Sequence, residues 1–110
     1  MSSALESFDR TRLDAAVAAG QPVLLDFSAD WCQPCRMLAP TIESLATSWA
    51  GRATIATVDV DSQPDLAREF GVQSIPTVVV LQDGNEVARF VGVQSESQFD
   101  EALQAVAGSA

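Results

Sequence analysis

The chain contains no histidine and no lysine, and it has only two cysteines. Without histidine, the Ser-His-Asp and Cys-His catalytic sets are excluded, and so are the usual zinc ligand sets. Two cysteines alone do not complete a tetrahedral structural zinc site, so we expect no metal. Any catalytic chemistry must therefore come from cysteine, carboxylate, hydroxyl or backbone groups.

Positive charge is also scarce, because six arginines face 15 acidic residues and give a net charge of -9. Nucleic acids and anionic membranes are bound through basic side chains that neutralise phosphate, so neither is an expected partner. The purely apolar runs are short, for example Val78 to Leu81, and none is long enough to span a bilayer. The N-terminus has no basic region followed by an apolar stretch, which predicts no secretory signal and a cytoplasmic location.

The length of 110 residues, with 47% hydrophobic and 19% charged residues, predicts a single globular domain over residues 1–110. The pattern alternates strands and helices in the order βαβαβαββα, which implies an α/β fold. A parallel half followed by an antiparallel hairpin predicts a three-layer α/β/α sandwich with a mixed sheet. The expected strands cover residues 4–8, 23–27, 53–60, 77–81 and 86–91. The expected helices cover residues 11–19, 34–49 and 64–70, and a last helix begins near residue 95.

Both cysteines lie in the segment Trp31-Cys32-Gln33-Pro34-Cys35-Arg36, which follows a predicted strand and opens a predicted helix. Unpaired N–H groups and the helix dipole stabilise a thiolate at this position. The apolar stripe of the helix, from Leu38 to Trp49, reaches Cys35 when it is extended back by three residues. Cys35 is therefore the predicted buried, resolving thiol, and Cys32 the more open nucleophile. The alternatives are a metal half-site shared by two chains or two structural thiols, but the sequence context favours a redox pair.

Asp26 is the only charged residue in the apolar run from Val23 to Phe27. Burial in such a strand would raise the pKa of its carboxyl. It could then take a proton from Cys35, directly or through water, when Cys35 attacks a mixed disulfide. The alternative is an aspartate at the strand end whose side chain reaches solvent.

Further motifs surround this pair, namely Asp26 to Cys35, Pro40, Val58 to Asp61, Ile75-Pro76-Thr77, Asp83-Gly84 and Val91-Gly92. With these motifs, the chain resembles the thioredoxin family over nearly all of its length. The resemblance implies a thioredoxin fold, in which four helices flank a five-stranded sheet. It also implies a cis peptide bond before Pro76, where a generic X-Pro bond is usually trans.

The resemblance implies a protein disulfide reductase. Cys32 would attack a client disulfide, Cys35 would resolve the mixed disulfide, and Asp26 would be the family's buried carboxylate. The chain itself would bind no cofactor. A thioredoxin reductase would restore the dithiol with electrons from NADPH. The other partners would be client proteins with disulfide bonds. A shallow apolar patch would hold an extended client segment, and its residues would be Trp31, Ile75, Pro76, Val91, Gly92 and Val93, with Val60 nearby.

Four positions depart from the family pattern. Gln33 replaces the usual glycine between the cysteines, whereas Pro34, which helps to keep the pair reducing, is retained; these two residues are expected to tune the redox potential. Ser28 replaces a frequent tryptophan, and Ser74 replaces a glycine before Ile75. Thr57 replaces a lysine near the buried carboxylate, which should raise the pKa of Asp26 further unless an arginine substitutes.

Three functions remain to be compared. The first is a general disulfide reductase of the cytosol, which we favour. The second is a thioredoxin-like binding module or co-chaperone, although such modules often lose a cysteine or a proline that this chain keeps. The third is an oxidant or isomerase of an oxidising compartment. No large apolar helix face is left over, so a monomer is expected.

Overall fold

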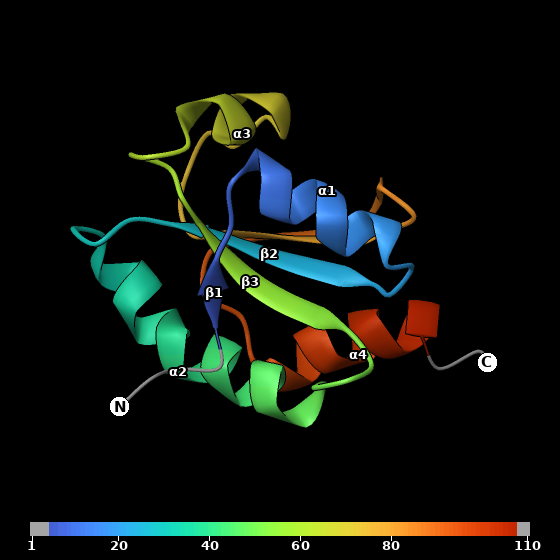
Figure 1. The fold of residues 1–110 in the computed structure, drawn as a ribbon. Helices are drawn as coiled ribbons and strands as arrows, with labels where there is room; N and C mark the ends of the chain where they lie inside the picture. The colour runs from blue at the N-terminus through green and yellow to red at the C-terminus, as the bar shows by residue number, and fades with distance from the viewer. Residues whose placement is uncertain (1–4, 108–110) are drawn as a thin grey trace.

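The computed structural model describes residues 5–107, in which four helices flank a five-stranded sheet (Figure 1). Residue 4, the predicted start of the first strand, lies outside the described residues. The elements are β1 (Glu6–Ser7), α1 (Arg10–Ala18), β2 (Val23–Ser28), α2 (Gln33–Ser48), β3 (Thr54–Asp59), α3 (Pro64–Glu69), β4 (Thr77–Gln82), β5 (Asn85–Val91) and α4 (Glu96–Ala107). Their order matches the predicted βαβαβαββα.

The strands are arranged in the order β1-β3-β2-β4-β5. β1, β3 and β2 run parallel, whereas β4 runs antiparallel to β2, and β5 antiparallel to β4. The sheet is therefore mixed, as predicted. The turn between β4 and β5 has positive φ at both Asp83 (55°) and Gly84 (83°), which is the geometry of a tight two-residue hairpin.

Helices cover both faces of the sheet, with α1 and α3 on one face and α2 and α4 on the other (Figure 1). Successive side chains of a strand point to opposite faces, so β2 contributes to both hydrophobic clusters. Leu24 packs in the cluster with α2 and α4, whereas Leu25 packs in the cluster with α1 and α3. This alternation turns Asp26 toward the α2 face of the sheet.

Helix α2 begins at the cysteine pair, and its apolar stripe fixes the helix against the sheet. Leu38, Ile42 and Leu45 are fully buried, as the predicted stripe requires. Pro34 lies in the first turn, where a missing N–H costs no intrahelical hydrogen bond. Pro40 lies inside the helix, where it removes one such bond. The buried stripe thus holds the first turn of α2 just beyond the C-terminal end of β2.

The predicted and observed boundaries differ by one or two residues. β1 is only two residues long, because pairing with the edge of β3 is limited to Glu6 and Ser7, and Phe8 adds one further hydrogen bond to Thr57 O. At the start of α4, the Gln98 side chain accepts the Ser95 N–H at 3.1 Å, which is one of the two hydrogen bonds of a capping box. No helix of residues 5–107 is both long and apolar enough to cross a membrane.

Candidate active site

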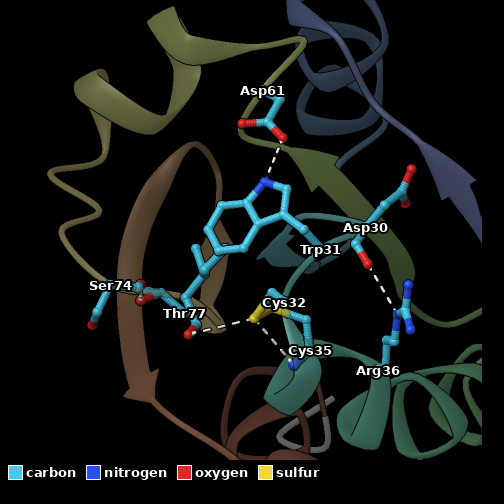
Figure 2. The surroundings of a disulfide bond; sticks show 9 residues. Asp30, Trp31, Cys32, Cys35, Arg36, Asp61, Ser74 and Thr77 are labelled. Atoms are coloured by element: carbon cyan, nitrogen blue, oxygen red, sulfur yellow. Dashed lines mark hydrogen bonds between the residues drawn. A yellow bond between two sulfur atoms is a disulfide. The ribbon is translucent and has the colours of Figure 1, made fainter.

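Cys32 and Cys35 are joined in a disulfide bond at the N-terminus of α2, with their Cα atoms 5.3 Å apart (Figure 2). Cys32 is the N-cap residue of the helix, and its Sγ atom accepts the N–H of Cys35 at 3.3 Å. The same sulfur lies 3.8 Å from the carbonyl oxygen of Ile75. One backbone donor and the positive end of the helix dipole thus meet at Cys32 Sγ, where they stabilise negative charge.

The two cysteines do not differ in burial as the helix pattern predicts. Cys32 is 5% exposed and Cys35 is 4% exposed, so the prediction that Cys32 is the more open residue is wrong for this disulfide form. The reason is tertiary, because Val60 and Ile75 come from other parts of the chain and pack against the pair. The two cysteines differ instead in their position relative to α2: Cys32 is the N-cap residue before the helix, whereas Cys35 lies in its first turn.

The carboxyl group of Asp26 is buried, with only 2% of the residue exposed. Its Oδ1 atom has no hydrogen-bond partner among the described residues. Loss of solvation raises the pKa of Asp26 from 3.8 to about 7. The desolvated carboxylate expected from the strand pattern is therefore confirmed, and the alternative of a side chain that reaches solvent is wrong.

Asp26 and Cys35 face a common pocket of about 410 Å³. The other residues that line it are Leu5, Ser28, Ala29, Asp30, Arg36, Ala39 and Thr57. Such a volume holds several water molecules, each of which occupies about 30 Å³ in the liquid. The pocket therefore leaves room for water beside both residues.

The peptide bond between Ile75 and Pro76 is cis. This segment precedes β4 and places the Ile75 carbonyl against Cys32, as described above. Two distant parts of the chain, the first turn of α2 and the residues before β4, therefore meet at the disulfide.

A thioredoxin family model matches residues 4–105 of the chain. The chain belongs to the thioredoxin family. It is 41% identical over 96 residues to a thioredoxin of Mycobacterium tuberculosis, and the match covers 87% of this chain and 83% of that protein. Among solved structures, an N21Q mutant thioredoxin from Halobacterium salinarum has a TM-score of 0.83 at 36% identity, with 97% of this chain and 96% of that chain covered.

A further relative is a bifunctional thioredoxin reductase/thioredoxin of Mycobacterium leprae, which is 41% identical over 93 residues. The match covers 84% of this chain, but this chain spans only a fifth (20%) of that longer protein. Family membership and the bonded Cys32–Cys35 pair together identify this thioredoxin as a thiol-disulfide oxidoreductase that acts on protein disulfides.

The position where many thioredoxins have a lysine holds Thr57, whose hydroxyl donates to the Glu6 carbonyl oxygen at 3.4 Å. Arg36 lines the pocket beside Asp26, but its Nε–H donates to the Asp30 carbonyl oxygen at 2.9 Å (Figure 2). Burial is the only cause of the raised pKa of Asp26, so no arginine compensates for the missing lysine.

The structure separates the predicted client patch into two parts. Trp31, Val60 and Ile75 line a groove of about 190 Å³ beside the disulfide. Val91 (56% exposed), the last residue of β5, and Val93 (46% exposed), which follows the strand, do not line this groove.

Two further residues of the patch have structural roles. Pro76 is buried, and its carbonyl oxygen accepts the Gly92 N–H at 2.9 Å. Gly92 has a φ of 91° and no heavy atom within 4 Å of the position of an added Cβ. Glycine is therefore required here by backbone conformation and not by close packing within the chain.

Several site residues were not predicted from the sequence. The groove is also lined by Ala67, Val72 and Gln73, which belong to α3 or follow it, and by Ser74, which the sequence marked only as a departure from the family pattern. Asp61 accepts the indole N–H of Trp31. The Val58 to Asp61 motif contained Asp61 but gave it no role. Gln33 and Pro34 are exposed in the first turn of α2, and their effect on the redox potential stays a prediction.

Proposed function

We propose that this thioredoxin is a general protein disulfide reductase. In one cycle the Cys32–Cys35 dithiol gives two electrons to a client disulfide, which becomes two thiols, and the pair itself becomes the disulfide seen here. The observation that carries the proposal is a Cys32–Cys35 pair at a helix N-terminus, next to a pocket that it shares with the buried, unpartnered Asp26. A bound cofactor is not needed for this chemistry.

Cys32 is the proposed nucleophile. Its place at the N-cap of α2, with the Cys35 N–H directed at Sγ, favours the thiolate in the reduced form. The thiolate attacks one client sulfur, a new S–S bond forms, and the other client sulfur leaves as a thiolate.

Cys35 then resolves this mixed disulfide. Its thiol must lose a proton before it attacks Cys32 Sγ, and the carboxylate of Asp26 accepts that proton through the shared pocket. A carboxyl group with a pKa of about 7 is suited to this role near neutral pH. The Cys32–Cys35 bond forms, and the bond between Cys32 and the client breaks to release the second client thiolate.

The client segment would lie across the apolar surface formed by Trp31, Val60, Ile75 and Pro76 and by the residues 91–93. Among the described residues, neither the N–H nor the carbonyl of Ile75 has a backbone hydrogen-bond partner. An extended segment that crosses the disulfide can therefore pair with Ile75 as an added strand does.

Return of the pair to the dithiol form is assigned to a thioredoxin reductase that uses NADPH. The relative from M. leprae, whose name joins a thioredoxin reductase to a thioredoxin, supports this partner. Both cysteines of the chain belong to the active pair, which suits a monomer in a reducing compartment such as the cytosol.

Reduction of insulin disulfides by dithiothreitol tests the proposal directly. We expect the protein to accelerate this reaction and Cys32→Ser to abolish the acceleration. Cys35→Ser should trap clients as mixed disulfides with Cys32, whereas Cys32→Ser should trap none. A binding module would retain the same partners in both variants without a covalent link. Equilibration with glutathione separates a reductant from an oxidant, because only a reductant remains largely in its disulfide form.

A further inference from the structure

The indole of Trp31 is exposed but held in place. The residue is 68% exposed, the largest value among the large hydrophobic residues of the described chain. Its Nε1–H donates to Asp61 Oδ2 at 2.7 Å (Figure 2). An exposed aromatic side chain without such a bond would exchange rotamers on the picosecond-to-nanosecond timescale. The bond to Asp61 therefore fixes the orientation of the ring.

Asp61 is itself fixed by the turn that follows β3. Its backbone N–H donates to Asp59 Oδ1 at 2.9 Å. The Val60 N–H donates to the Ser28 carbonyl at 2.9 Å, and the Gln63 N–H donates to the Asp59 carbonyl at 2.8 Å. The carboxylate is thus held in position before any client binds.

The fixed indole forms one wall of the groove of about 190 Å³ described above. Val60 and Ile75 line this groove and also pack against the Cys32–Cys35 pair, so the groove adjoins the reacting sulfurs. An apolar cavity of about 150 Å³ is large enough to hold benzene. The groove therefore has room for one apolar side chain next to a client cysteine.

The rim of the groove is negatively charged near Asp61. Neither Asp59 nor Asp61 forms an ion pair with any described residue, whereas Arg68, the arginine of α3, is paired with Asp65 at 3.0 Å. Only Oδ2 of Asp61 is engaged by the indole, which leaves the charge of the carboxylate open to a cationic group. A client side chain with a positive charge would find its complement at this point.

We propose that Asp61 determines client specificity: it holds Trp31 as the wall of the groove and selects segments in which a lysine or arginine flanks an apolar residue beside the cystine. The inference rests on the proposed reductase function, because it names the class of client for the same site. Asp61 acts on the apolar residue through Trp31 and on the basic residue through its own charge.

Matched peptide disulfides test this inference. Each peptide carries a leucine beside its cystine and differs only in the flanking residue, which is arginine, glutamine or glutamate. Pre-reduced protein is mixed with excess peptide after removal of dithiothreitol, and released thiols are quantified after an acid quench. For the unmodified protein at low salt, we expect the arginine peptide to half-saturate the rate at a concentration about two- to five-fold below that of the glutamate peptide.

Two variants separate the two roles of Asp61. Asp61→Asn keeps an acceptor for the indole but removes the charge, so the difference between the arginine and glutamate peptides should disappear. Asp61→Ala also releases Trp31, so the half-saturating concentration of the glutamine peptide should rise as well, and acrylamide should quench the fluorescence of Trp31 more strongly. Glu101→Gln, at an exposed position of α4, makes the same change of net charge and should keep the preference for arginine.

The outcomes distinguish this inference from the function on which it rests. If the unmodified protein reduces none of the peptides, the reductase function itself fails. If it reduces all three with equal half-saturation, or if Asp61→Asn keeps the preference for arginine, the role of Asp61 is refuted and the reductase function stands. If Glu101→Gln loses the preference as Asp61→Asn does, the selectivity belongs to the overall net charge and the inference is again refuted.

Discussion

Replacement of Asp26 by asparagine tests whether burial alone sets the properties of this carboxyl group. Asparagine has nearly the same shape but carries no charge at any pH. In the folded protein the pKa of Asp26 is raised to about 7 because the group is desolvated, whereas in the unfolded chain it is close to 3.8. Between these two pH values the folded state holds a proton that the unfolded state has lost.

The sign and size of the effect follow from this difference. Stability falls as the pH rises from about 4 to about 7, because the folded state binds more protons than the unfolded state in this range. A difference of 7 minus 3.8, or about three pKa units, at about 1.4 kcal/mol per unit corresponds to about 4 kcal/mol in total. Roughly 1.5 kcal/mol of this is already lost at pH 5, so about 3 kcal/mol remains to be lost by pH 8.5.

The assay is urea unfolding of the disulfide form, in which no thiol titrates, at several pH values between 5 and 8.5. We expect the free energy of unfolding of Asp26→Asn, relative to the unmodified protein, to rise by about 3 kcal/mol over this range. The other carboxyl groups are present in both proteins, so their titration cancels in the difference. Glu101→Gln serves as the exposed control and should show no comparable trend. A flat difference for Asp26→Asn would refute the reasoning, because it would mean that the carboxyl has no unusual pKa.

Three further substitutions test the fold around the site. Gly92→Ala forces a side chain onto a φ of 91° and should cost about 1–3 kcal/mol of unfolding free energy; an unchanged urea midpoint would contradict this. Leu38→Ala opens a cavity beneath the first turns of α2 and should cost about 2–5 kcal/mol, which thermal unfolding would detect, whereas a loss below 1 kcal/mol would mean that the helix is loosely packed. Trp49→Phe leaves Asp100 without the indole N–H that it accepts at 2.8 Å, and it should cost about 1–3 kcal/mol by chemical unfolding; Asp100→Ala, which removes the acceptor, should also destabilise the protein, whereas Asp100→Asn, which keeps one, should cost less.

Much of the fold could be predicted from periodicity. The alternating and apolar runs gave five strands, and the stripe from Leu38 to Trp49 gave the long helix with Cys35 on its buried side, because burial imposes these periods on the sequence. Asp83-Gly84 predicted the hairpin because few residues adopt positive φ. The extent of β1 was not predictable, since its two residues are defined only by pairing with β3.

The site was predicted in part. The pair of cysteines and the buried Asp26 follow from their positions along the chain and are confirmed. The equal burial of Cys32 and Cys35 was missed, because the segments that cover Cys32 come from residues far away in the sequence. Asp61 was missed for the same reason: its bond to Trp31 joins residues 30 positions apart.

The sequence by itself pointed to the chemistry of this protein: with no histidine, and with both cysteines at a predicted helix N-terminus, it favoured a reactive thiol pair, because helix dipoles and strand periodicity act locally. The tertiary structure alone decided which groups surround that pair. Ile75 beside Cys32, the pocket shared by Asp26 and Cys35, and the Asp61–Trp31 bond all depend on contacts between distant segments. Such contacts are fixed by the packing of helices on the sheet, which no local pattern records.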